Sequence, residues 1–132
     1  KRAIEPRLGF WTLPAGFLEN NETTQEGALR ETKEEANASA TIIDVFSLID
    51  IPHINQVYLL YRAKLEDANF SATFESSDVA LFDESSIPWD DIAFAAIKKS
   101  LKRYFSDKRS GTFSLHAETI NVSTLKKHRI GS

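Results

Sequence analysis

The segment from Gly16 to Ala38 reads GFLENNETTQEGALRETKEEANA and predicts a turn that leads into a helix. We expect the helix from about Thr24 to Ala36, because Thr23 and Glu26 have the spacing of a capping box, in which each side chain satisfies a free backbone N–H. At about 100° per residue, one face of this helix is narrow and suited to close packing on a sheet. That face carries Ala28, Leu29, Thr32 and Ala36.

Three carboxylates project from one edge of the predicted helix. Glu31, Glu34 and Glu35 fall within an arc of about 100°, since residues three and four apart are neighbours on a helix. Like charges at this spacing repel, and a hard divalent cation such as Mg²⁺ or Mn²⁺, which prefers oxygen ligands, would relieve the repulsion. Arg30 precedes the cluster and can orient a carboxylate with its forked guanidinium. Taken alone, the pattern ExxEE is more often a solvated acidic face than a metal site.

The spacing around this cluster resembles the Nudix box, G-x5-E-x7-R-E-U-x-E-E-x-G-U, where U is usually a bulky aliphatic residue. The matching positions are Gly16, Glu22, Arg30, Glu31, Glu34 and Glu35. Thr32, Asn37 and Ala38 differ from the pattern, and none of them replaces a carboxylate. Asn37 stands where the family has glycine, but asparagine also adopts the left-handed conformation of a helix C-cap, so we expect the helix end to survive.

The resemblance implies an α/β fold, a Nudix α/β/α sandwich with a mixed β-sheet and the box helix packed on it. Pieces outside the box, such as Gly9 to Phe17 and Asp50 to Tyr58, are similar to the branch of ADP-ribose/FAD pyrophosphatases. We therefore expect a Nudix hydrolase domain over residues 1–116 that lacks some N-terminal strand residues. Residues 117–132 are expected to be a C-terminal tail, with Gly131-Ser132 as a cloning remnant.

The same resemblance implies hydrolysis of the pyrophosphate bond in a nucleoside diphosphate derivative such as ADP-ribose or FAD, with release of AMP. Mg²⁺ or Mn²⁺ would be held by Glu31, Glu34, Glu35 and the backbone carbonyl of Ala15. Arg30 would orient the carboxylates, and Glu31 is either a ligand or the general base. Gly16, Glu22 and Asn37 are expected to be structural, with Glu22 as a partner for Arg30 or the loop.

An acidic residue from outside the box often assists the metal site in this family, and Glu75 and Asp78 are the candidates here. For both residues an ordinary exposed loop charge is the default interpretation, and Glu75 is the stronger candidate of the two. The alternative function is that of a non-catalytic, nucleotide-binding sensor that regulates a partner, and the intact glutamate cluster favours the enzyme. RNA decapping is a third possibility, for which a stronger basic groove would be expected.

Composition narrows the classes of partner. The chain has 132 residues, a net charge of −3 and no cysteine, which excludes disulfides, cysteine-ligated zinc and thiol catalysis. An acidic chain does not favour a broad nucleic-acid surface. The resemblance to the Nudix family implies a nucleotide-derived small molecule as substrate. No apolar run approaches the roughly 18 residues that cross a membrane. We therefore expect a cytoplasmic protein and, by analogy with the family, a homodimer.

The rest of the chain predicts a sheet. The β-branched run at residues 39–51 predicts one bent strand or two. Residues 55–65 give the strongest strand signal, and their apolar side chains on both faces suggest a central strand that is covered on both sides. Residues 79–82 are expected to form a further strand, and residues 112–116 a short extended piece.

A second helix is expected after Asp90 or Asp91, which can cap it, and it should run to about Asp107. Its apolar stripe comprises Phe94, Ile97, Leu101 and Phe105. The other side is basic, with Lys98, Lys99, Lys102, Arg103, Lys108 and Arg109. Such a side can bind nucleic acid or phosphate, but a solvated face that complements the helix dipole is the more common origin.

Overall fold

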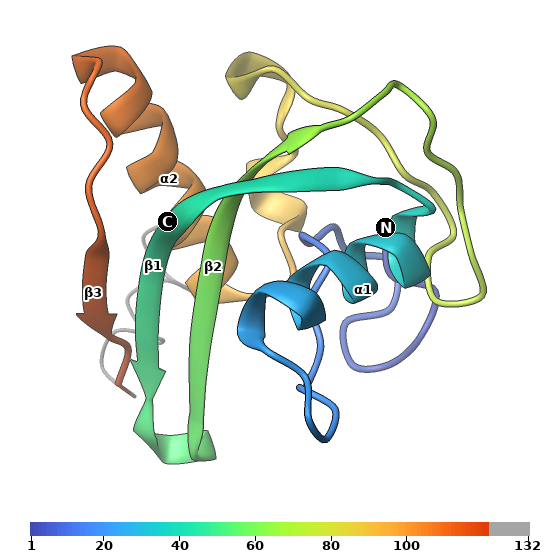
Figure 1. Ribbon diagram of the computed structural model, residues 1–132, viewed down its shortest axis with the longest axis horizontal. Coiled ribbons are helices and arrows are strands. Elements are labelled where there is room, and N and C mark those ends of the chain that lie inside the picture. Colours follow the sequence, from blue (N-terminus) through green and yellow to red (C-terminus); the bar gives the residue numbers. More distant parts are fainter. Residues whose placement is uncertain (122–132) are drawn as a thin grey trace.

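A computed structural model describes residues 1–121 of the chain (Figure 1). Its elements in order are α1 (Thr24–Ala36), β1 (Ala40–Ile51), η1 (Pro52–Ile54), β2 (Gln56–Leu65), η2 (Glu84–Ser86), η3 (Trp89–Asp91), α2 (Ala95–Ser110) and β3 (His116–Thr119). The first helix has the bounds that the capping signals predict. The expected cloning remnant and most of the expected tail lie outside the described residues. Within residues 1–121, no helix is both long and apolar enough to span a membrane.

The main sheet is mixed and has the strand order β2-β1-β3. β1 pairs antiparallel with β2 through the hairpin that η1 closes, and parallel with β3. The expectation that residues 55–65 form the central strand is therefore wrong: β1 is central, and β2 lies at the edge of the three-stranded sheet. The apolar residues of β2 instead reflect the cover that each of its faces receives from a helix.

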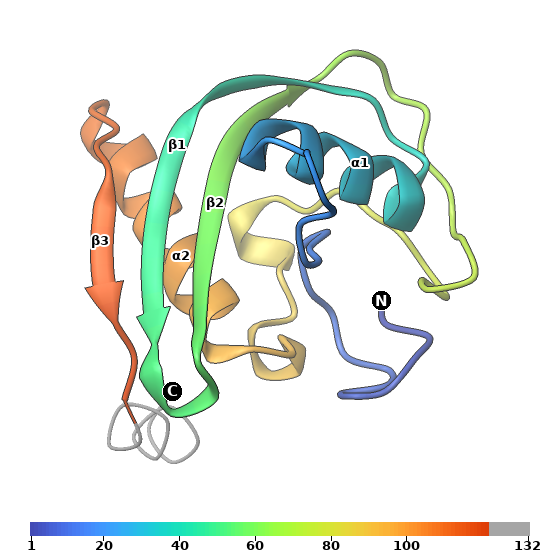
Figure 2. The same cartoon turned by 60° about the horizontal axis from the view of Figure 1, so that its bottom comes forward.

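The contacts of β2 place the two helices on opposite faces of this sheet. In Figure 2, α2 lies behind β1 and β2, and α1 lies beside β2. Tyr58 of β2 packs against the buried cluster of Ile49, Ile51, Ala96 and Ile120, which α2 shares. Tyr61, three residues further on and so on the other face, hydrogen-bonds the hydroxyl of Thr24 in α1 at 2.5 Å. The arrangement is the expected α/β/α sandwich of the α/β class.

The chain continues in the sheet beyond residue 116. The short extended piece expected at residues 112–116 lies instead at β3. The residues of β3 pair with Ser47 to Asp50 of β1. Ile120 is 1% exposed, and its backbone N–H donates to the carbonyl of Asp50 at 2.8 Å. Residues 117–120 are thus part of the core and not a tail, because β1 offers a free edge and the core accepts the Ile120 side chain.

A second, irregular β-network lies outside the main sheet. Residues 1–3 hydrogen-bond residues 9–10 on one side and residues 75–77 on the other, and Trp11 bridges to Ile92. The strand expected at residues 79–82 does not form: no ladder partner lies beside it in the described chain, and the Phe82 ring instead meets the Trp11 ring edge-on at 5.1 Å. This network carries residue 75 toward the helix α1.

The second helix begins later than predicted. Asp90 and Asp91 lie in η3, and α2 starts after Phe94, which supplies no side-chain cap. The helix ends at Ser110, where Gly111 takes the left-handed conformation with φ of 80°. Its basic side chains are largely engaged within the fold. Lys99 and Arg103 pair with Glu118, Arg109 pairs with Glu84, and Lys102 lies over the Trp89 ring.

Candidate active site

Local hydrogen bonds fix both ends of α1, the helix that carries the acidic cluster. Thr23 Oγ1 accepts from the Glu26 N–H at 3.1 Å, and the Glu26 carboxylate accepts from the Thr23 N–H at 3.0 Å, which completes the capping box. At the other end Asn37 has a φ of 53°, and its N–H donates to the carbonyl of Lys33. Its side-chain amide also donates to Ser71 Oγ at 2.9 Å. The expected asparagine C-cap is confirmed.

Arg30 forms ion pairs with several glutamates of the site. Its guanidinium makes a two-pronged contact with Glu22, with Nε to Oε2 at 2.6 Å and Nη2 to Oε1 at 3.0 Å. Nη1 donates to Glu31 Oε1 at 2.8 Å and to Glu34 Oε2 at 3.1 Å. The hydrogen bonds from Arg30 hold the pKa of Glu22 below its usual range. The prediction that Glu22 pairs with Arg30 is confirmed, and one cation orients the carboxylates of three different glutamates.

The turn before α1 is held against the same group. Arg30 Nη2 donates to the carbonyl of Phe17 at 3.1 Å, and Glu19 lies 3.5 Å from Nη1. Gly16 packs directly on Glu31: a Cβ at residue 16 would lie 2.7 Å from Glu31 Oε2 and closer still to Oε1 and Cδ. Only a glycine leaves room for the Glu31 carboxylate in this position.

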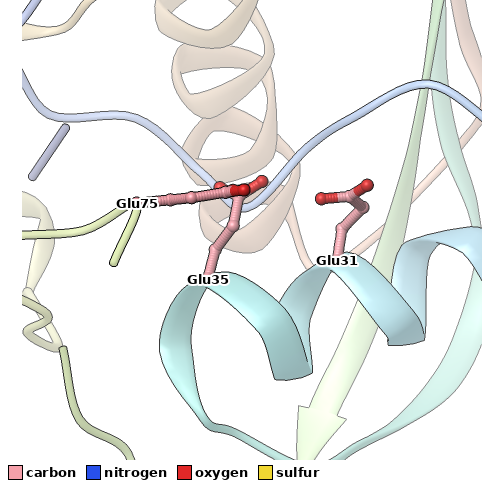
Figure 3. Close-up of side chains that lie close together, drawn as sticks. All are labelled: Glu31, Glu35 and Glu75. Atoms are coloured by element: carbon pink, nitrogen blue, oxygen red, sulfur yellow. The ribbon is translucent and has the colours of Figure 1, made fainter. Parts of the chain in front are cut away.

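Three glutamates converge at the centre of the site (Figure 3). Glu31 and Glu35 project from adjacent turns of α1, and Glu75 reaches in from the loop that follows β2. One carboxylate oxygen of each lies within 4.8 Å of the others. The backbone of Glu75 is fixed by the N-terminal segment, since the Ala3 N–H donates to the Glu75 carbonyl at 3.0 Å. This convergence joins residues that are 40 positions apart in the sequence.

The other candidate residues lie at the margin of this cluster. The Ala15 N–H donates to Glu35 Oε1 at 3.3 Å, so the turn touches the cluster through its backbone. Glu34 is half exposed and is held by Arg30. Asp78 accepts a hydrogen bond from the Val79 N–H on its side chain and from the Lys1 amino group on its carbonyl. Of the two acids outside the box, the structure brings Glu75 and not Asp78 to the three-glutamate group.

The cluster has the character of a cation site. Burial, together with the hydrogen bond and the negative charge of Glu31, raises the pKa of Glu35 to about 8. Burial and the nearby Glu31 both disfavour the charged form of Glu35, and a bound cation would offset both effects. Carboxylate oxygens on three residues are the donors that Mg²⁺ and Mn²⁺ prefer. The residues present therefore fit a hard divalent cation.

The raised pKa of Glu35 predicts how the stability of the cation-free protein depends on pH. Between an unfolded value near 4.5 and a folded value of about 8, the folded protein keeps a proton that the unfolded chain has released. The contribution of Glu35 to stability is therefore lost as pH rises through this window. Burial lowers the pKa of the α-amino group of Lys1, which makes stability rise with pH. A variant at residue 35 is therefore needed to isolate the effect of Glu35.

We expect the melting temperature in a chelator to fall by on the order of a few degrees more in the wild type than in Glu35→Gln between pH 5.5 and 8.5. Saturating Mg²⁺ should remove this difference in how the melting temperature depends on pH, because the cation takes the place of the proton on Glu35. Equal slopes for the two proteins in the chelator would contradict the raised pKa. Differential scanning fluorimetry in a series of buffers provides the measurement.

Sequence reasoning missed two contacts that support the site. Glu19 adds a carboxylate to the surroundings of Arg30, and nothing in its spacing indicated this. Gly27 is buried inside α1, where a Cβ would lie 2.6 Å from Leu18 Cδ2 and 3.0 Å from Glu22 Oε1. A glycine within a helical pattern is the signal that could have shown this close approach of the turn.

Comparisons with known proteins agree with this geometry. Residues 1–106 match the family model described as the NUDIX domain. A crystal structure of a NUDIX hydrolase from Nitrosomonas europaea has a TM-score of 0.90 and 53% sequence identity, and the match covers 92% of this chain and 69% of that one.

Two further proteins are more distant. An ADP-ribose pyrophosphatase from Streptococcus suis 89-1591 has a TM-score of 0.63 at 20% identity, over 83% of this chain and 82% of that one, and so shares the fold. An RNA pyrophosphohydrolase from Erythrobacter litoralis is 38% identical over 52 residues, which are 39% of this chain and 32% of that protein. The chain thus matches about a third of the length of that relative. With the family match spanning most of the chain, and with the Nitrosomonas structure superimposing over nearly all of it, this protein belongs to the Nudix hydrolase family.

Proposed function

We propose that this protein hydrolyses the pyrophosphate bond of a nucleoside diphosphate derivative, such as ADP-ribose or FAD, in a reaction that depends on a divalent cation and releases AMP. The observation that supports this most is the convergence of Glu31, Glu35 and Glu75, whose oxygens lie within 4.8 Å of one another. A pyrophosphate carries negative charge that repels nucleophiles, so its hydrolysis needs charge neutralisation of the kind that such a site provides.

Glu31, Glu35 and Glu75 would hold Mg²⁺ or Mn²⁺, with Glu34 and the carbonyl of Ala15 at the edge of the site. The cation, when bound, neutralises the charge of the pyrophosphate and makes a nearby water more acidic. Arg30 holds Glu31 Oε1 at 2.8 Å and so orients this carboxylate for either role open to it, ligand of the cation or base that accepts the proton of the attacking water. Gly16 leaves the space in which that carboxylate lies.

A second candidate is the hydrolysis of a pyrophosphate at the 5′ end of RNA. It is favoured by the 38% identity to the RNA pyrophosphohydrolase from Erythrobacter litoralis over 52 residues. The bond that is cleaved has the same chemistry, and the difference lies in what holds the rest of the substrate. Four of the basic residues of α2 are engaged with Glu118, Glu84 or Trp89, which leaves fewer cations for an RNA backbone and favours a small nucleotide.

The test is a panel of pyrophosphate compounds with Mg²⁺ or Mn²⁺: ADP-ribose, FAD, NADH, diadenosine polyphosphates, capped RNA and 5′-triphosphorylated RNA. We expect cleavage of ADP-ribose or FAD to AMP, and its loss in a chelator and in Glu31→Gln. Glu66→Gln is the matched control, because Glu66 is an exposed carboxylate that contacts Thr41 on the sheet. Binding of a compound without cleavage of any would favour the sensor function, and cleavage of RNA alone would favour the second candidate.

A further inference from the structure

Two exposed phenylalanines directly adjoin, along the chain, residues that form or support the three-glutamate group. Phe74, which directly precedes Glu75, is 100% exposed, and Phe17, which directly follows Gly16, is 79% exposed. Single exposed apolar residues are common on protein surfaces and carry no meaning alone. Here, however, both rings are the backbone neighbours of residues that form or support the site. Exposed rings at these two positions are therefore available to contact a ligand bound at the site.

The backbone that presents each ring is held by hydrogen bonds. The carbonyl of Phe17 accepts from Arg30, the same guanidinium that orients Glu31. On the other segment, Thr73 donates its N–H to the Ser76 carbonyl and accepts the Glu75 N–H on its hydroxyl, so that Phe74 stands at a closed turn. Among residues 1–121, neither ring takes part in the aromatic pairs or cation–π contacts that most of the other rings form. The backbone of each phenylalanine is therefore fixed, while its ring contributes no aromatic pair or cation–π contact to the described part of the fold.

We propose that Phe17 and Phe74 bind the planar heteroaromatic ring of the substrate by stacking, while its pyrophosphate lies at Glu31, Glu35 and Glu75. This inference rests on the proposed function and adds to it the residues that hold the base. In a nucleotide a ribose separates the base from the phosphates, so a stacking surface has to lie beside the carboxylates and not among them. Stacking accepts any flat ring, which predicts that adenine, another base or a flavin serves at this position.

The experiment compares Phe17→Ala, Phe74→Ala and the double variant with Leu115→Ala, a matched loss of an exposed apolar side chain, 58% exposed, that lies just before β3. We expect KM for ADP-ribose or FAD to rise about 5- to 100-fold in the double variant, with kcat little changed. Tyrosine at both positions should restore KM and leucine should not, because stacking needs a flat ring. KM for P1,P2-dimethyl diphosphate, which has no base, should not change in any variant.

An active wild type whose KM for ADP-ribose and FAD is unchanged in the double alanine variant would overturn the stacking proposal and leave the hydrolase function intact. If the wild type cleaves nothing in the panel, the hydrolase function fails, and calorimetric titration of ADP-ribose in Mg²⁺ then decides the stacking. Weaker binding to the double variant than to the wild type supports it, and equal or absent binding overturns it. A dimer that becomes monomeric in the alanine variants by sedimentation, with KM unchanged, would assign the rings to a contact between copies and also overturn it.

Discussion

Replacement of Glu35 by glutamine is expected to lower kcat about a thousandfold while raising the melting temperature of the cation-free protein at pH 8. The amide keeps the shape of the side chain but removes one of the charges that would hold the cation. A loss of about 4 kcal/mol of transition-state stabilisation corresponds to this factor. The stability rises because Glu35 no longer has to be charged beside Glu31 and Glu75 in a partly buried site, the situation that raises its pKa to about 8.

The opposite directions of these two effects make the result diagnostic, since a variant that loses activity by unfolding would also melt earlier. Steady-state kinetics at saturating Mg²⁺ and thermal unfolding in a chelator supply the two readouts. Glu66→Gln, whose carboxylate lies away from the cluster, should change neither. A Glu35→Gln protein with wild-type kcat would remove Glu35 from the catalytic site, and one that melts earlier at pH 8 would contradict the repulsion between the glutamates.

The parts of the fold that sequence predicts well are those set by neighbours along the chain. The bounds of α1 follow from the capping box of Thr23 and Glu26 and from the tolerance of Asn37 for a left-handed C-cap, and each contact spans a few residues. The pairing of Glu22 with Arg30 belongs to the same class, because a turn and two helical turns separate them. Local geometry decides these features, so their residue types are enough to predict them.

The parts that sequence did not decide depend on segments that meet across the fold. Glu75 reaches Glu31 and Glu35 because the backbone of Ala3 pairs with it, and no spacing near residue 75 indicates that pairing. The same dependence on distant segments explains why β1, and not the predicted β2, is the central strand. Apolar residues on both faces of β2 reflect the helices that cover those faces. The central position of β1 instead depends on its pairing with β3, which comes more than fifty residues later in the chain.

The glycine of the box joins both kinds of feature, since it lies in a local turn and is required by a contact with the helix. Gly16 precedes α1 by a loop, yet the Glu31 carboxylate occupies the space where its side chain would lie. The same carboxylate accepts a hydrogen bond from Arg30 at 2.8 Å and lies in the cluster with Glu35 and Glu75. A change at residue 16 therefore acts on the chemistry through Glu31, although the glycine itself has no reactive group.

Gly16→Ala is accordingly expected to lower kcat about a hundredfold and to destabilise the protein by about 1–3 kcal/mol. The added methyl group would lie 2.7 Å from Glu31 Oε2 and closer to Oε1, so the carboxylate or the turn has to move. Moving the carboxylate breaks its alignment with Arg30 and the cluster, and a displacement of this size at a reacting centre has a large effect on rate. Chemical denaturation and steady-state kinetics of the single variant measure the two losses.

A double-mutant cycle tests whether Glu31 is the cause. In a Glu31→Ala background no carboxylate occupies the space beside residue 16, so Gly16→Ala should destabilise the protein by much less than it does in the wild type. The difference between the two costs is the coupling of the glycine with Glu31. If Gly16→Ala has the same cost in both backgrounds, the methyl group disturbs the turn itself, and the role of this glycine in seating the Glu31 carboxylate is wrong.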